Sequence, residues 1–93
     1  MVYDRKFLRL DGEELTVREA EIFEILLENR GKPLTRVKLA DKYFEKYCIE
    51  DVSKECITEN NVAVLICRIN KKTNVIKSKR SVGYYIDEKI KIS

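Results

Sequence analysis

Three segments of this chain carry apolar residues at helical spacing. In the first, between Thr16 and Gly31, one wide face gathers Ala20, Ile22, Phe23, Leu26 and Leu27. Thr16 and Glu19 form a T-x-x-E capping box, which satisfies free N–H groups at the start of a helix. Gly31 ends the predicted helix, because glycine readily takes the left-handed conformation found there. The charged residues expected outside the apolar face are Arg18, Glu21, Glu24 and Glu28.

The second segment begins at Thr35, after an extended Lys32-Pro33-Leu34, because proline disfavours helix at the residue before it. Thr35 caps a predicted helix from Arg36 to about Phe44. The positions expected to face the core are Val37, Leu39, Ala40, Tyr43 and Phe44. The following residues, 46–57, have weak periodicity and mixed charge, which predicts a loop with a helical turn near residues 50–54.

The third segment, which Thr58 caps, has the clearest division between two faces. At about 100° per residue, the side expected to face the core gathers Val62, Leu65, Ile66 and Ile69. The opposite side gathers Asn60, Val64, Cys67 and Lys71, flanked by Asn61, Ala63 and Arg68. Lys71 and Lys72 lie in the last turn, where positive charge also complements the helix dipole.

Short β-prone runs flank this helical region. Near the N-terminus, residues 7–10 and 13–15 predict a hairpin around Asp11-Gly12, a strong two-residue turn signal, and Tyr3 is a weaker candidate for an earlier strand. After the third helix, residues 75–79 and 83–86 predict a second hairpin. The tip of this second hairpin carries Lys79 and Arg80. Together these elements predict one α+β domain that occupies residues 1–93.

Charge is distributed unevenly along the chain, although the net charge is only +3. Residues 1–57 hold 11 Lys/Arg and 13 Asp/Glu, whereas residues 58–93 hold 8 Lys/Arg and 3 Asp/Glu. An excess of this kind in the C-terminal part indicates a polyanion partner, and a solvated surface is the alternative. No apolar run approaches the roughly 18 residues that cross a membrane, and the N-terminus lacks the apolar core of a signal peptide. These features predict a cytoplasmic protein.

The cysteines do not predict a metal site or a catalytic centre. Cys48, Cys56 and Cys67 show no CxxC spacing, and the chain contains no histidine, so a zinc site is not expected. Three reduced thiols suit an intracellular protein. Cys67 has Lys71 and Arg68 nearby but no base to activate it, and no phosphate-binding glycine motif occurs. We therefore expect no enzyme activity, no cofactor and no small-molecule substrate.

In order and spacing, these elements resemble the DNA-binding effector domain of OmpR/PhoB-type response regulators, a winged helix-turn-helix. The motifs that carry the resemblance are Leu15-Thr16-x-x-Glu19, Leu26-Leu27, Asn29-x-Gly31, Thr35-Arg36-x-x-Leu39, Val62 to Lys72, and Ile76-x-Ser78-x-Arg80-x-x-Gly83-Tyr84. The pair Gly83-Tyr84 is the most specific of these. Ser81 stands where the family has a wing glycine. Family members usually carry polar or charged residues at the positions where this chain has Ala63, Leu65 and Asn70.

The resemblance implies a bacterial, sequence-specific transcription regulator of two-component type. Its third helix (about 59–72) would enter the major groove of double-stranded DNA, and its wing (about 75–86) would point toward the minor groove. The DNA-contacting residues, taken from the resemblance and from the outward positions of helix and wing, are Asn60, Asn61, Val64, Cys67, Arg68, Lys71, Lys72, Ser78, Lys79 and Arg80. Arginine and lysine neutralise phosphates, amides pair with base edges, and Ala63 or Val64 can contact thymine methyl groups.

Further partners are implied by the same resemblance. The segment between the second and third helices would contact RNA polymerase through Glu50, Asp51 and Glu55, and two copies would pair on tandem half-sites. A receiver domain with its phosphorylatable aspartate is absent from these 93 residues. The alternative is a winged-helix module for protein contact, in which the apolar Ala63, Val64 and Cys67 form the interface.

Overall fold

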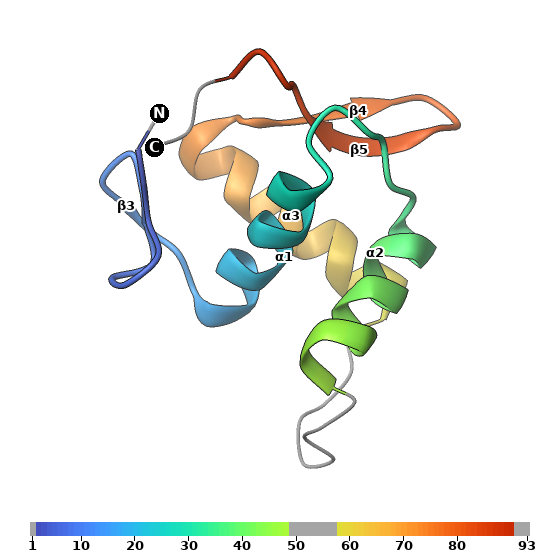
Figure 1. Cartoon of the computed structure of the whole chain (residues 1–93), viewed down its shortest axis with the longest axis horizontal. Coiled ribbons are helices and arrows are strands. Elements are labelled where there is room, and N and C mark those ends of the chain that lie inside the picture. The colour runs from blue at the N-terminus through green and yellow to red at the C-terminus, as the bar shows by residue number, and fades with distance from the viewer. Residues whose placement is uncertain (1, 49–57, 91–93) are drawn as a thin grey trace.

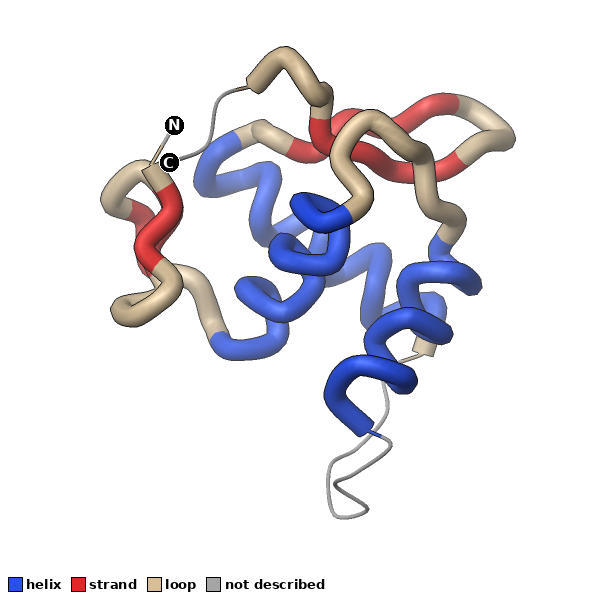
Figure 2. Tube along the Cα trace, in the orientation of Figure 1, coloured by secondary structure: helices blue, strands red, loops and turns tan. Residues whose placement is uncertain are grey.

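The computed structural model describes residues 2–48 and 58–90 of the chain (Figures 1 and 2). The elements are, in chain order, β1 (Tyr3–Asp4), β2 (Arg9–Leu10), β3 (Glu13–Glu14), α1 (Val17–Glu28), α2 (Arg36–Tyr43), η1 (Phe44–Cys48), α3 (Glu59–Thr73), β4 (Ile76–Lys79) and β5 (Gly83–Ile86). The strands β1, β2 and β3 form an antiparallel sheet, and β4 pairs with β5 in an antiparallel hairpin. We call this hairpin the wing. The N-terminal sheet and the wing tip lie at opposite ends of the molecule in Figure 1.

The core lies between the three helices and is closed by Leu10 of β2 and by Ile76 and Ile86 of the two wing strands. Helix α1 packs against both α2 and α3, and it also contacts β5. The fully buried side chains come from every layer of the fold and include Leu10, Phe23, Leu39, Val62, Ile69 and Ile86. No helix within residues 2–48 and 58–90 is long and apolar enough to cross a membrane.

All three predicted helix starts are confirmed. The hydroxyl oxygens of Thr16, Thr35 and Thr58 each accept a hydrogen bond from the backbone N–H three residues later, at 3.1 to 3.3 Å. These contacts satisfy N–H groups that have no partner inside the helix. At the end of α1, Gly31 has a φ of 82°, as its predicted terminating role requires.

The predicted N-terminal hairpin is confirmed, in shorter form. Asp11 and Gly12 have φ values of 51° and 84°, the left-handed pair that a tight two-residue turn needs. The weaker candidate strand at Tyr3 is present as β1. Phe7 and Leu8 were expected in the hairpin but lie in the turn before β2, and the Phe7 side chain is exposed. The reason is that Asp4 accepts hydrogen bonds from the N–H groups of the following turn, including that of Phe7.

Two of the predicted core positions of α2 are wrong. Leu39 and Tyr43 are fully buried, but Val37 and Phe44 are 49% and 47% exposed. Val37 lies about 200° around the helix from Leu39, so both cannot face the same core. The predicted loop from residue 46 is also wrong at its start, because η1 continues the helix as far as Cys48.

The predicted position of Glu21 outside the apolar face is wrong as well. Its side chain is buried, and the Tyr43 hydroxyl donates a hydrogen bond to its Oε1 at 2.9 Å. A buried carboxylate is tolerated because a donor from another helix reaches it. Beside this contact, burial and the neighbouring Glu24 raise the pKa of both Tyr3 and Tyr47 to about 12, so both phenols are neutral at physiological pH.

Candidate nucleic-acid interface

Helix α3 presents one continuous outer row to solvent. Its predicted core positions are confirmed, because Val62, Leu65, Ile66 and Ile69 are all buried. The opposite row consists of Asn60, Val64, Cys67 and Lys71, and all four are exposed. These positions are spaced by four, three and four residues, so they follow one line along the helix. The outer row therefore offers an amide at one end, an ammonium group at the other and apolar groups between them.

The wing is tied to α3 by a single amide side chain. Oδ1 of Asn70 accepts a hydrogen bond from the Ile76 N–H at 2.9 Å, and Nδ2 of Asn70 donates to the Ile76 carbonyl at 2.8 Å. Asn74 ends the helix in the left-handed conformation, which reverses the chain toward β4. The two hydrogen bonds fix where the first wing strand begins relative to the helix. Sequence inspection found Asn70 only as a departure from a family pattern and missed this role.

The second wing strand is tied to the segment before α2. Leu34 and Tyr84 form an isolated bridge in which each backbone N–H donates to the carbonyl of the other residue at 2.8 Å. Beside this bridge, the wing tip and the first turn of α2 enclose a groove of about 600 Å³. Its lining includes the guanidinium-bearing residues Arg36 and Arg80. With Lys79, three cationic residues from α2 and the wing therefore line one groove.

The tip of the wing contains one residue in an unfavourable backbone conformation. Ser81 has a φ of 66°, in the left-handed region where a side chain costs about 1–2 kcal/mol. A glycine at this position would take the same conformation without that cost. We predict that Ser81→Gly raises the free energy of unfolding by about 0.5–1 kcal/mol, once the greater freedom of glycine in the unfolded chain is subtracted. Thermal unfolding followed by circular dichroism measures the change, and a fall in the melting temperature would contradict it.

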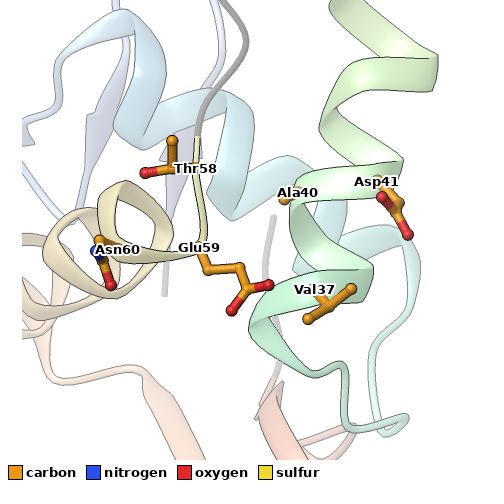
Figure 3. A pocket seen from close by; sticks show the side chains of 6 residues that line it. All are labelled: Val37, Ala40, Asp41, Thr58, Glu59 and Asn60. Carbon is orange, nitrogen blue, oxygen red and sulfur yellow. The ribbon is translucent and has the colours of Figure 1, made fainter.

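A second hollow, of about 440 Å³, lies between α2 and the start of α3. Figure 3 shows the side chains that line it. They belong to Val37, Ala40, Asp41, Thr58, Glu59 and Asn60. Because Val37 lines this hollow and Arg36 lines the wing groove, the first turn of α2 joins the α3 terminus to the wing tip. The surface from α3 to the wing is thus continuous. Two acidic residues line the hollow, Asp41 of α2 and Glu59 at the start of α3 (Figure 3).

The positive charges divide into two groups by their partners. Ion pairs among the described residues include Arg5 with Glu24, Lys46 with Glu28 and Lys72 with Glu19. Five cations of α3 and the wing have no carboxylate partner within residues 2–48 and 58–90: Arg68, Lys71, Lys77, Lys79 and Arg80. All five are exposed. This part of the surface therefore carries five cations that form no ion pair with the described residues.

Most of the predicted DNA-contacting residues lie on this surface. The structure brings the helix residues Asn60, Asn61, Val64, Cys67, Arg68 and Lys71 together on exposed positions of α3. The wing residues Ser78, Lys79 and Arg80 are exposed as well. The predicted polymerase-contacting residues Glu50, Asp51 and Glu55 lie outside the described residues.

Lys72 differs from the other predicted contacts. Its Nζ lies 2.9 Å from Oε2 of Glu19, which is 2% exposed, and it donates to the Glu14 carbonyl at 2.7 Å. A buried carboxylate without a partner would be costly, so this lysine is held against α1. The sequence associated Glu19 with the capping box of α1 and gave no sign of this long-range partner. We therefore leave Lys72 out of the candidate interface.

Three helices, an N-terminal sheet and a C-terminal wing define a winged helix-turn-helix fold. The structure is similar to that of the C-terminal domain of the nisin resistance regulator NsrR, a lantibiotic response regulator. The TM-score is 0.65 at 23% sequence identity, over 83% of this chain and 76% of that chain. No protein-family model and no curated protein matches the sequence. The likeness confirms the predicted α+β winged-helix fold.

Proposed function

We propose that this chain is a DNA-binding transcription regulator whose α3 enters the major groove while the wing reaches the minor groove. The observation that carries the proposal is the group of five exposed cations on α3 and the wing that have no acidic partner among the described residues. Within α3, Lys72 differs because it pairs with Glu19. Outside α3 and the wing, Arg5 and Lys46 pair with carboxylates, whereas Lys6 and Lys38 have no carboxylate partner among the described residues. A cluster of unneutralised cations is the usual feature of a phosphate-binding surface.

The shape of the surface supports the same proposal. A major groove admits one α-helix, and the outer row of α3 runs from Asn60 to Lys71 without interruption by a neighbouring element. The wing tip carries Arg80, and an arginine fits the negative potential of a narrow minor groove. Since Asn70 and Leu34 anchor the two wing strands, helix and wing would meet DNA as one body.

The regulatory context of the proposal comes from likeness and not from the site. NsrR is a response regulator, and the similarity of its C-terminal domain favours a role of two-component type for this chain as well. Contact of Glu50, Asp51 and Glu55 with RNA polymerase, and pairing of two copies on tandem half-sites, remain part of the proposal. The site offers positions for binding and positioning, so we propose no catalytic step.

The test of the proposal is binding to DNA fragments at several salt concentrations. We expect Arg80→Ala to cost about 1–2 kcal/mol of binding free energy, or roughly five- to thirtyfold in Kd. The salt dependence of log Kd should also become shallower by about one, because one cation leaves the interface. A mobility-shift titration or fluorescence anisotropy measures both quantities.

Lys6→Ala is the matched control for charge. Lys6 is exposed in the turn between β1 and β2, in the N-terminal sheet at the end of the molecule opposite to the wing tip (Figure 1). Both changes remove one positive charge, so a loss caused by net charge alone would be equal in the two variants. An equal loss would contradict the proposed docking. Absence of any shift at low salt would favour the alternative, a protein-contact module centred on Val64 and Cys67.

A further inference from the structure

We infer that α3 selects A·T-rich DNA, and that Val64 is the specificity-determining residue through contact with thymine methyl groups. The inference rests on the proposed DNA-binding function and names the class of DNA that this surface fits. It concerns only the central part of the outer row of α3, where the side chains have no hydrogen-bonding group strong enough to read a polar base edge.

The outer row is apolar where a recognition helix would lie deepest. Asn60 and Lys71 stand at its ends, about 16 Å apart along the helix axis. Between them lie Val64, which is 47% exposed, and the exposed Cys67, with the half-buried Ala63 beside them. Asn61 and Arg68 border this centre on one side, where they line a shallow hollow together with Val64, and Ala63 lies on the other side. A base pair placed against it would meet methyl groups and a thiol.

Only one base offers a matching surface in the major groove. Guanine presents two acceptors, cytosine a donor, and adenine a donor and an acceptor, whereas thymine adds a methyl group at C5. Polar edges pressed against Val64 would lose their water without gaining a partner, which is costly. The thymine methyl group instead gains an apolar contact. Val64 is also rigid, since a β-branched side chain has one preferred rotamer in a helix.

The neighbouring amides favour the partner base of thymine. Asn60 and Asn61 are exposed in the first turn of α3, four and three residues before Val64. An asparagine can pair in a bidentate manner with N6 and N7 of adenine. Among the exposed residues near Val64, Arg68 is the exception, because its guanidinium group could form hydrogen bonds with guanine. The Arg68 side chain lines a shallow hollow at one edge of the outer row, together with Arg18, Asn61 and Val64, and a guanidinium group at this edge suits a phosphate.

The wing favours the same class of DNA independently. Arg80 lies at the wing tip, and its guanidinium group would enter the minor groove beside the helix site. A·T tracts have a narrow minor groove with enhanced negative potential, which attracts arginine. Guanine would also place its 2-amino group, a hydrogen-bond donor, in that groove, where it opposes the donors of an arginine. Helix and wing therefore point to A·T pairs by two different physical effects.

The experiment starts with selection of duplexes from a random-sequence library by the immobilised chain. We expect the retained duplexes to be A·T-rich, with thymines at the positions that α3 covers. Each such thymine is then replaced by deoxyuridine, which keeps every hydrogen-bonding group and lacks only the 5-methyl group. The Kd should rise roughly three- to fourfold for each methyl group that Val64 contacts.

Val64→Ala provides the decisive comparison. This variant removes the methyl groups of Val64 and leaves a good helix former, so the fold should persist. The Kd of this variant should be nearly equal for the thymine duplex and the deoxyuridine duplex. In a double-mutant cycle, this result means that the contact between Val64 and the thymine methyl group accounts for the discrimination. Lys71→Ala is the control, since loss of a phosphate contact should weaken binding to both duplexes by the same factor.

Three outcomes would overturn the inference. Equal affinity of the parent protein for thymine and deoxyuridine duplexes would exclude methyl contact while leaving the proposed DNA binding intact. Thymine discrimination that persists in Val64→Ala would remove Val64 from the role. Selection of G·C-rich duplexes would contradict the A·T class altogether. If no duplex bound even at low salt, the proposed function itself would fail, which distinguishes the two levels of the hypothesis.

Discussion

Gly83→Ala should destabilise this protein more than any other conservative change in the wing. A Cβ atom at position 83 would lie 2.3 Å from the carbonyl oxygen of Leu34 and 2.7 Å from the backbone nitrogen of Thr35. Gly83 also has a φ of 132°, which side-chain-bearing residues rarely adopt. Both neighbours are backbone atoms, so no side-chain rotation relieves the contact. We expect a loss of about 3–5 kcal/mol in the free energy of unfolding.

The loss should appear as a fall of more than about 10 °C in the melting temperature. It should also release the wing, because the Leu34–Tyr84 bridge cannot form with the strand displaced. Gly12→Ala is the matched control. Gly12 has a φ of 84° but no atom within 4 Å of an added Cβ, so only backbone strain of about 1 kcal/mol is expected. Similar losses in the two variants would show that close approach to Leu34 contributes nothing.

Val64→Asp should nearly abolish DNA binding. The side chain is exposed at the centre of the outer row of α3, so aspartate is compatible with the fold. In the proposed complex its carboxylate would face the negative charge of DNA, and a like-charge contact costs several kcal/mol. A cost of about 3 kcal/mol corresponds to a Kd roughly a hundredfold higher. Anisotropy titration with the selected duplex measures this change directly.

Val64→Asn separates charge from shape at the same position. Asparagine has nearly the size and polarity of aspartate without its charge, so it should lose only the contribution of the valine methyl groups. The expected loss is several-fold, in contrast to about a hundredfold for aspartate. Equal binding by Val64→Asp and the parent protein at moderate salt would mean that α3 does not enter the groove. Circular dichroism of both variants checks that the helix persists.

The sequence by itself determined the elements whose signals are local. Thr16, Thr35 and Thr58 cap the three helices as predicted, because a hydroxyl that accepts from an N–H three residues later needs no distant partner. The buried stripe of α3 followed from helical periodicity, since each residue's direction depends only on its place in the helix. The two hairpins followed from turn residues and β-prone runs. These signals were sufficient to predict the winged-helix fold.

Only the tertiary structure decided which polar side chains are available at the surface. Lys72 and Lys71 are neighbours in sequence, yet the first pairs with the buried Glu19 and the second remains exposed. Asn70 looked like an ordinary polar residue and holds the wing. Gly83 was singled out in the sequence only by a resemblance. The physical reason for a glycine there is the close approach of the Leu34 backbone, in the segment before α2. Each of these roles depends on contacts between residues far apart in the chain or on different elements, and local sequence patterns do not encode such pairings.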